Sequence, residues 1–502
     1  MATAVLIDSA EHFDTAAVLA VADGAPLRLT PALVEALATR RRQVEGALAG
    51  EKPVYGVSTG MGAASDIRLD TAAQSLQQDN LMLARAVGSP PWLDEKSSRA
   101  AVAVRLQSFL NGDAGVSAEL CVRLTDLLNH RLHPAIPATG VGASGEIIPL
   151  AHLGGCITGS GAFLDGAGAR PAAEALAAAG LQPLRLGPKE GVALIEGVPV
   201  TTALALLHSR SSRLLADQAT AVFAAGLCIT GANQDPLDPL VARANAELAA
   251  VLDAVRRLAG APSLPRALQA PLSFRVAGPA LAHLLRSTVH LDSAVERATA
   301  GVTDSPAFLD GRFLGTAGFD AFDLAAALDG LRTAVIHLTE ICAAQLHRLL
   351  DERVTGLSRQ LSDRPGLHGG MVAVHKRAVG VTHQLLSCSR PSSLGAMETS
   401  LGQEDIQSYS IEAAMACSSA LTGAREVLAC ELLALIQATR LAPGLPPAMR
   451  GQLPSLLAEV ADVVPPGTGD RPYGLDISAI TGVLADGWGH GLLGPQPSNP
   501  AL

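Results

Sequence analysis

The chain has 502 residues, of which 48% are hydrophobic and 17% charged, with a formal net charge of −10 and a mean hydropathy of +0.30. The acidic balance and the lack of a basic run argue against a nucleic-acid partner, which needs a concentrated cationic patch. Charged residues interrupt the apolar runs before they reach the length of a membrane span, and the first 25 residues carry no cation of the kind that precedes the apolar stretch of a secretory signal.

Apolar residues at helical spacing predict a mainly α-helical fold with a bundle of long helices at its centre. In chain order the periodic stretches cover residues 211–231, 240–258, 321–361 and 411–441. Glycine and proline punctuation then divides the chain into three regions. We expect a loop-rich N-terminal lobe over 1–125, the central helical bundle over 126–440, and short C-terminal helices with a tail over 441–502.

The cysteines and histidines are scattered along the chain. The seven cysteines are an odd number without a CxxC pair, so we expect reduced thiols and a cytoplasmic protein. The thirteen histidines form no HExxH motif or comparable cluster, so no metal site is expected. With membrane spans set aside, large subunit interfaces are the expected reason for the apolar composition.

Residues 140–152 form the most informative segment, Gly-Val-Gly-Ala-Ser-Gly-Glu-Ile-Ile-Pro-Leu-Ala-His. The segment lacks the lysine of a phosphate-binding loop. The small neighbours of Ser144 let the backbone fold so that the Gly145 nitrogen attacks the Ala143 carbonyl, a closure that needs strained backbone angles. Loss of water from that ring and from Ser144 would leave a conjugated methylidene, which is a strong electrophile.

This segment resembles the signature of the histidine and phenylalanine ammonia-lyases and aminomutases, which use a 4-methylideneimidazole-5-one (MIO) group. Further stretches resemble the family in the expected order, at residues 55–62, 76–88, 189–195, 273–275, 303–306 and 403–408. The resemblance implies the family's helical fold and an MIO made autocatalytically from Ala143, Ser144 and Gly145. It also implies that no external cofactor or metal is needed, because covalent capture of the substrate amine activates the leaving group.

The resemblance implies roles for five further residues. Tyr55 would remove the β-proton of the substrate, so we expect cations or hydrogen-bond donors to lower its pKa from the usual value of about 10. Glu404 would take a proton from the substrate ammonium, and Arg275 would bind the α-carboxylate with two parallel hydrogen bonds. Phe313 and Gln403 would line the substrate pocket. The alternatives are structural: a turn tyrosine, a glutamate at a helix start, a surface arginine and a core phenylalanine.

Three pocket positions depart from the family pattern. Arg85 stands where the family has histidine or an apolar residue, Glu196 where it has asparagine, and Leu272 where it has tyrosine. Isolated buried charges are costly, so Arg85 and Glu196 should pair with each other or with the substrate. We therefore expect an amino acid substrate with a polar or charged side chain.

Three functions fit these observations. The first is an ammonia-lyase that makes an α,β-unsaturated acid, the second a 2,3-aminomutase that makes a β-amino acid, and the third a catalytically silent helical scaffold. By resemblance, the chain would assemble as a homotetramer in which three subunits build each active site. We then expect Tyr55 and Ser144 to meet across a subunit boundary.

Overall fold

The computed structural model describes residues 3–50, 52–141, 144–166, 168–260, 264–395, 397–442, 449 and 451–494. Helices make up 61% of it, which confirms the prediction of a mainly α-helical fold. The strands of the described part form three separate two-stranded sheets. Six of the seven cysteines are buried, in line with the apolar surroundings of most of them in the sequence.

The chain forms two compact units, each made of three separate segments. The first unit combines Met1–Leu207, Leu291–Asp329 and Pro391–Met415, and the second combines His208–His290, Gly330–Arg390 and Ala416–Leu502. Four long helices contribute residues to both units: α9 (Pro199–Thr230), α12 (Leu272–Ala300), α13 (Phe322–Leu349) and α16 (Ser410–Leu441). These units cut across the three consecutive regions expected from the punctuation of the sequence.

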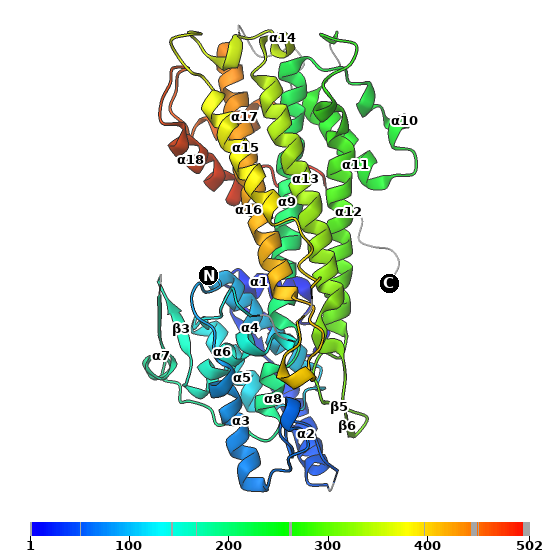
Figure 1. Cartoon of the computed structure of the whole chain (residues 1–502), viewed down its shortest axis with the longest axis vertical. Helices are drawn as coiled ribbons and strands as arrows, with labels where there is room; N and C mark the ends of the chain where they lie inside the picture. The colour runs from blue at the N-terminus through cyan, green and yellow to red at the C-terminus, as the bar shows by residue number, and fades with distance from the viewer. Residues whose placement is uncertain are drawn as a thin grey trace. The chain divides into compact units, whose positions relative to one another are not determined.

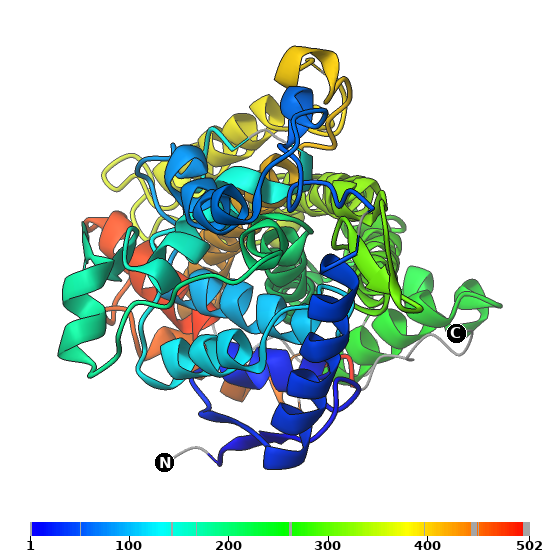
Figure 2. The ribbon, with the colours of Figure 1, turned by 90° about the horizontal axis from the view of Figure 1, so that it is seen from below.

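The first unit packs short helices around the start of α9 (Figures 1 and 2). Its helices are α1 (Thr15–Ala22), α2 (Pro31–Leu48), α3 (Thr71–Arg85), α4 (Glu95–Leu110), α5 (Ala118–Asn129), α6 (Ile147–Thr158), α7 (Ala172–Ala178) and α8 (Glu190–Ile195). The unit also contains four 3₁₀ turns, η1 (Gly62–Ala64), η2 (Ser144–Glu146), η4 (Gly318–Asp320) and η6 (Ser400–Gly402). Helices α3, α6 and α8 pack against one another, which brings three segments of the predicted site together.

All three sheets belong to the first unit. Strands β1 (Val5–Ile7) and β2 (Leu27–Leu29) pair in parallel, with Val5 opposite Leu27. The antiparallel pairs are β3 (Ala162–Asp165) with β4 (Gly168–Pro171), and β5 (Ala307–Leu309) with β6 (Arg312–Leu314). The last of these hairpins carries Phe313, one of the predicted pocket residues.

In the second unit the long helices run side by side as a bundle, with shorter helices packed beside them (Figure 1). Its own elements are η3 (Asp235–Leu237), α10 (Pro239–Ala242), α11 (Ala246–Ala259), α14 (Glu352–Thr355), η5 (Arg359–Leu361), α15 (Val372–Ser387), α17 (Leu453–Ala461) and α18 (Tyr473–Ala485). The described C-terminal part of the chain contains the short helices α17 and α18.

The periodic stretches correspond to α9, α11, α13 and α16, although the third was predicted too long. Helix α13 ends at Leu349, and the Asp351 side chain then accepts a hydrogen bond from the Arg353 N–H and opens the short helix α14. Aspartate at this position favours a new helix start over continuation of the old helix. One helical stretch, 190–230, is apolar and long enough to cross a membrane, but 94% of its most apolar window is buried, as in a core helix.

Candidate active site

Residues 144–146, here called the electrophile segment, adopt a strained turn at the start of α6. Gly145 has φ 76° and Glu146 has φ 57°, both in the left-handed region. A Cβ atom on Gly145 would lie 3.1 Å from Oε2 of Glu196 and 3.5 Å from Cδ2 of Phe319. Glycine is therefore required both by its backbone angle and by this close approach. Ala143, the third residue of the predicted electrophile, lies outside the described residues.

Glu146 anchors the electrophile segment to the start of α9. Its carboxylate accepts hydrogen bonds from the backbone N–H groups of Val200 and Thr201, both at 2.7 Å. Burial raises the pKa of Glu146 to about 7, although these bonds and Arg105 lower it. A carboxylate at a helix N-terminus also meets the positive end of the helix dipole. The side chain thus holds the strained turn in place.

Ser144 points toward the start of α16. Its Oγ donates to the carbonyl oxygen of Ile406 at 3.3 Å and to Oε1 of Gln407 at 3.4 Å. The segment that carries the predicted Gln403 and Glu404 therefore lies against the electrophile segment within one chain. The segment thus combines a small residue at 145, left-handed backbone angles and a serine hydroxyl oriented by two acceptors.

Glu196 is a buried acid beside Gly145, directly after α8, and is 6% exposed. Burial raises its pKa to about 8, and the neighbouring carboxylates of Asp304 and Glu404 add to this, while Lys189 and Arg105 lower it. Glu196 is therefore mostly protonated and neutral at pH 7, so it can donate a hydrogen bond. Its Oε2 is the carboxyl oxygen that faces Gly145 of the electrophile segment.

A buried ion pair lies behind this acid. Nζ of Lys189, which is completely buried, is 2.6 Å from Oδ2 of Asp304. The other Asp304 oxygen is buried without a hydrogen-bond partner in the described part of the chain. Arg105, also buried, donates to the backbone carbonyl of Glu196 and fixes the peptide that carries the acid. The charges around Glu196 are thus held by a rigid core.

Tyr55 lies in residues 54–62, here called the tyrosine loop, and its hydroxyl bonds to the last residue of this loop. The Gly62 N–H donates to the Tyr55 hydroxyl at 2.7 Å, and the side chain is 37% exposed. Burial raises the pKa of Tyr55, and Glu196 and Glu404 raise it further, which outweighs the Gly62 bond and the positive charge of Arg85. The expected donor and cation are present, but the expected lowering of the pKa is wrong for the free chain.

The same electrostatic neighbourhood contains Tyr55, Arg85, Glu196 and Glu404, because each acts on the pKa of one or more of the others. Oε2 of Glu404 accepts from the Thr399 hydroxyl at 2.8 Å. Tyr55 and Gly145 thus both neighbour Glu196 in a single chain. The expected meeting of Tyr55 and Ser144 across a subunit boundary stays a prediction.

Arg85 and Glu196 do not pair directly. Among the residues that the structure describes, no carboxylate oxygen lies within 4.0 Å of the Arg85 guanidinium, and the charge of Glu196 reaches it only over a longer distance. One of the two predicted arrangements, a mutual ion pair, is therefore absent. The other, pairing with substrate, stays open.

The remaining predicted residues are placed elsewhere or without a site contact. Phe313 packs on Phe308 across its hairpin, with ring centroids 5.1 Å apart, which favours the core alternative. Gln403 is exposed beside Glu404. Leu272 and Arg275 belong to the second unit at the start of α12, where Arg275 donates to Gln269 at 3.1 Å. Their roles at the site stay predictions.

Three side chains at the site were missed by sequence reasoning. Phe319 packs beside Gly145, Gln407 accepts from Ser144, and Arg105 holds the Glu196 backbone. Phe319 and Arg105 lie in segments without a motif, so no local signal marks them. Gln407 occupies one of the variable positions of the Gln-Glu-Asp-x-x-Ser motif, and its proximity to the motif is the signal that could have found it.

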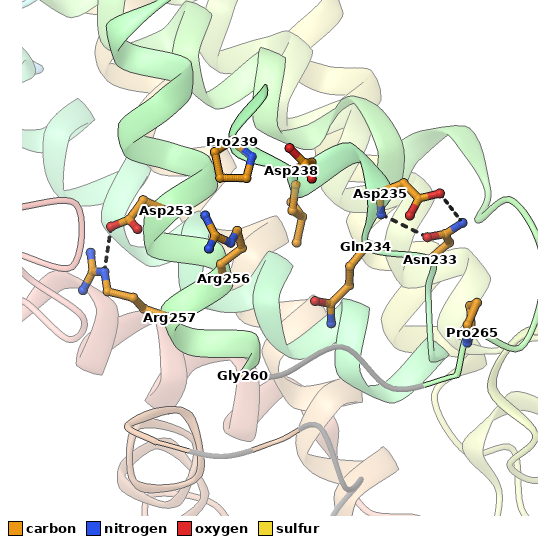
Figure 3. A pocket seen from close by; sticks show the side chains of 11 residues that line it. Asn233, Gln234, Asp235, Asp238, Pro239, Asp253, Arg256, Arg257, Gly260 and Pro265 are labelled. Carbon is orange, nitrogen blue, oxygen red and sulfur yellow. Dashed lines mark hydrogen bonds and ion pairs between the residues drawn. The ribbon is translucent and has the colours of Figure 1, made fainter. Parts of the chain in front are cut away.

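The second unit contains a separate hollow of about 600 Å³ near α11 (Figure 3). Four of its polar side chains bond in pairs: Arg257 donates to Asp253 at 3.0 Å, and Asn233 donates to Asp235 at 3.0 Å. None of the predicted site residues lines this hollow. Across the described part of the chain, no group of three or more histidine, cysteine or acidic side chains could hold a metal ion.

Comparisons with known proteins identify the family of this fold. Residues 13–460 match the family model for aromatic amino acid lyases. The histidine ammonia-lyase of Gloeobacter violaceus is 31% identical to this chain, and the alignment covers 92% of each protein. The histidine ammonia-lyase of Symbiobacterium thermophilum is also 31% identical, and the alignment covers 96% of this chain and 97% of that protein. The fold resembles tyrosine aminomutase from Streptomyces globisporus, with a TM-score of 0.90, 24% identity and 98% of both chains covered.

A second solved structure, ergothionase from Treponema denticola, has a TM-score of 0.89 at 22% identity and covers 97% of this chain and 99% of that one. At these identities the solved structures establish the fold. The family model and the histidine ammonia-lyase relatives establish more, because they match almost the whole chain. The chain therefore belongs to the aromatic amino acid lyase family, whose members are carbon–nitrogen lyases and aminomutases.

Proposed function

We propose that the protein is an MIO-dependent ammonia-lyase that converts an L-α-amino acid to an α,β-unsaturated acid and ammonia. One observation carries this proposal. Glu196 lies against Gly145, and the charge of Glu404 raises its pKa, while the charges of both acids raise the pKa of Tyr55. Electrophile segment, base and amine-handling acid are thereby neighbours within one unit. The relatives named histidine ammonia-lyase support the same reaction class.

The MIO, made from Ala143, Ser144 and Gly145, would supply an electrophile that activates the substrate amine as a leaving group. The chain's own residues prepare its site. Glu146 holds the turn against α9, and the carbonyl of Ile406 orients the Ser144 hydroxyl before closure. Glu196, as a neutral acid, would be a hydrogen-bond donor at the electrophile segment.

Tyr55 and Glu404 would move the protons of the elimination. Tyr55 takes the β-proton in its phenolate form, the Cβ–H electron pair forms the Cα–Cβ double bond, and the Cα–N bond breaks as ammonia leaves. Glu404 accepts a proton from the substrate ammonium and returns one to the departing ammonia. Because Glu196 is neutral below about pH 8, its repulsion of the Tyr55 phenolate is weak at neutral pH.

Four further residues would complete the substrate site. Arg275 binds the α-carboxylate, and Leu272, Phe313 and Gln403 bound the pocket, as the family resemblance implies. A homotetramer with shared sites, in the cytoplasm, would supply these residues from neighbouring subunits. It is supported by the exposed apolar residues of two helices, which a subunit interface would cover: Leu76 and Leu83 of α3, and Val379 and Leu386 of α15.

Intact-mass measurement on the purified protein tests the proposal. We expect a mass lower by two waters and a new near-ultraviolet absorbance, both lost in Ser144→Ala. The matured protein should release ammonia from an amino acid, and product analysis should find the unsaturated acid. A β-amino acid as the main product would make the protein an aminomutase. An unmodified mass with no ammonia release would refute both, and favour a helical scaffold.

A further inference from the structure

Arg85 is the last residue of α3, and a buried glutamine of the same helix fixes its position. Gln78 donates to the Gly56 carbonyl and accepts from the Val192 N–H, both at 3.2 Å. One side chain thereby ties α3 to the tyrosine loop and to α8. The guanidinium of Arg85 is consequently carried by a helix braced against the two segments that bear Tyr55 and Glu196.

Arg85 is partly buried, and no counter-ion among the described residues contacts it directly. Burial lowers its pKa, but a guanidinium stays charged at neutral pH. The groups whose charges act on it are Tyr55, Glu196 and Glu404, none of them within 4.0 Å in an ion pair among the described residues. Two of these three, Tyr55 and Glu196, are mostly neutral at pH 7 because burial raises their pKa values. A partly desolvated cation in this position is stabilised further by a ligand anion.

An amino acid with a neutral side chain carries no anion that could bind Arg85 in addition to the α-carboxylate bound by Arg275. Under the proposed function, Glu404 meets the substrate ammonium and Arg275 meets the α-carboxylate. Both charges of a zwitterion are then matched, and Arg85 remains as one additional cation. A site for histidine or phenylalanine has no use for it, because their side chains carry no anion at neutral pH.

We propose that the substrate is an L-amino acid with an acidic side chain, and that Arg85 binds the side-chain carboxylate. The inference rests on the proposed function and adds the substrate class to it. The planar guanidinium matches a carboxylate with two parallel hydrogen bonds, which gives orientation as well as charge. Glu196, which is mostly neutral at pH 7, leaves the attraction of Arg85 for this anion intact.

The neighbourhood of Tyr55 and Arg85 favours a short side chain. Tyr55 removes a proton from the β-carbon, and its hydroxyl lies close enough to Arg85 for each to shift the pKa of the other. The side-chain carboxylate should therefore sit on the β-carbon or one carbon beyond it, as in aspartate and glutamate. Such a carboxylate opposes loss of the neighbouring proton by its negative charge, and a guanidinium bound to it removes that opposition. Elimination would yield ammonia and an unsaturated dicarboxylate.

The test is a set of acid and amide pairs assayed on the full-length protein after its mass has shown maturation. We expect kcat/KM for aspartate or glutamate to exceed that for asparagine or glutamine by about 100-fold, because a neutral amide leaves the desolvated guanidinium without an anionic partner. Arg85→Gln should remove most of this preference. Arg28→Gln, the same change at an exposed arginine of β2, should leave it unchanged. Melting temperatures of both variants check that they fold.

The outcomes separate the two proposals. Ammonia release from histidine, phenylalanine or the amides in preference to the acids would overturn the acidic substrate and leave the lyase proposal standing. An acid preference that survives Arg85→Gln in a folded variant would overturn the role of Arg85. Inhibition of the wild type by succinate, but not by its monoamide, is the expected binding result that does not depend on turnover. A matured protein that releases no ammonia and forms no β-amino acid from any amino acid would instead refute the proposed function.

Discussion

Replacing Glu196 by glutamine removes the ionisable proton of this side chain and preserves its shape. The carboxyl group is 6% exposed and lies beside Gly145, with Asp304 and Glu404 as charged neighbours. Burial raises its pKa from 4.5 to about 8. Glu196→Gln should therefore change how the free energy of unfolding depends on pH, while the packing around Gly145 is kept.

The sign follows from proton uptake in the two states. Below pH 4.5 the acid is protonated in both the folded and the unfolded chain, and its protonation lowers the free energy of unfolding by nothing there. Between pH 4.5 and about 8 the unfolded chain releases the proton and the folded chain keeps it, so stability falls as pH rises. At pH 7 the accumulated loss is about 3 kcal/mol, from 1.36 kcal/mol for each pH unit above 4.5. Above pH 8 the loss levels off.

Urea unfolding followed by circular dichroism between pH 4.5 and 8.5 measures this difference. The wild type and Glu196→Gln should be of similar stability at pH 4.5, and the variant should be more stable by about 3 kcal/mol at pH 7. Glu146, whose pKa is also raised, titrates in both proteins and cancels in the comparison. Parallel stability curves would refute the reasoning, since they would show that Glu196 is ionised in the folded chain.

Two other changes have clear expected outcomes. Lys189→Met leaves the buried Asp304 carboxylate unpaired and should lower the free energy of unfolding in urea by about 3 to 5 kcal/mol. Lys189→Met combined with Asp304→Leu should recover much of this loss. Equal stabilities of the single variant and the wild type would contradict the buried ion pair. Tyr55→Phe removes the proposed base and should lower kcat by about 100- to 10,000-fold with an unchanged melting temperature, because the side chain is 37% exposed; full activity would assign the base to another group.

Several parts of the fold follow from local sequence. Apolar residues at helical spacing predicted the stretches that form α9, α11, α13 and α16, because that spacing places them on one face of a helix. Ring closure at Ala143, Ser144 and Gly145 was predicted to need strained backbone angles, and Gly145 and Glu146 have left-handed angles, while the ring itself stays a prediction. The order of motifs along the chain predicted the family, which the family model confirms.

The division into units and the protonation states did not follow from the sequence. Each unit joins three separated segments, and punctuation by glycine and proline carries no information about which distant segments pack together. The lowered pKa expected for Tyr55 was wrong because desolvation is set by the packed unit as a whole. Glu196 is a neutral acid because burial, Asp304 and Glu404 act on it together, and the last two are far from it in sequence.

The sequence by itself thus determined which chemical groups the chain contains and which backbone segment can close into a ring. Those properties reside in residue identity and in spacing along the chain. The tertiary structure decided that Tyr55, Glu196 and Glu404 share one neighbourhood, that Glu196 holds its proton, and that Arg85 lacks a counter-ion in direct contact within the described residues. Charge and protonation depend on desolvation and on neighbours in space, and only the folded chain fixes these.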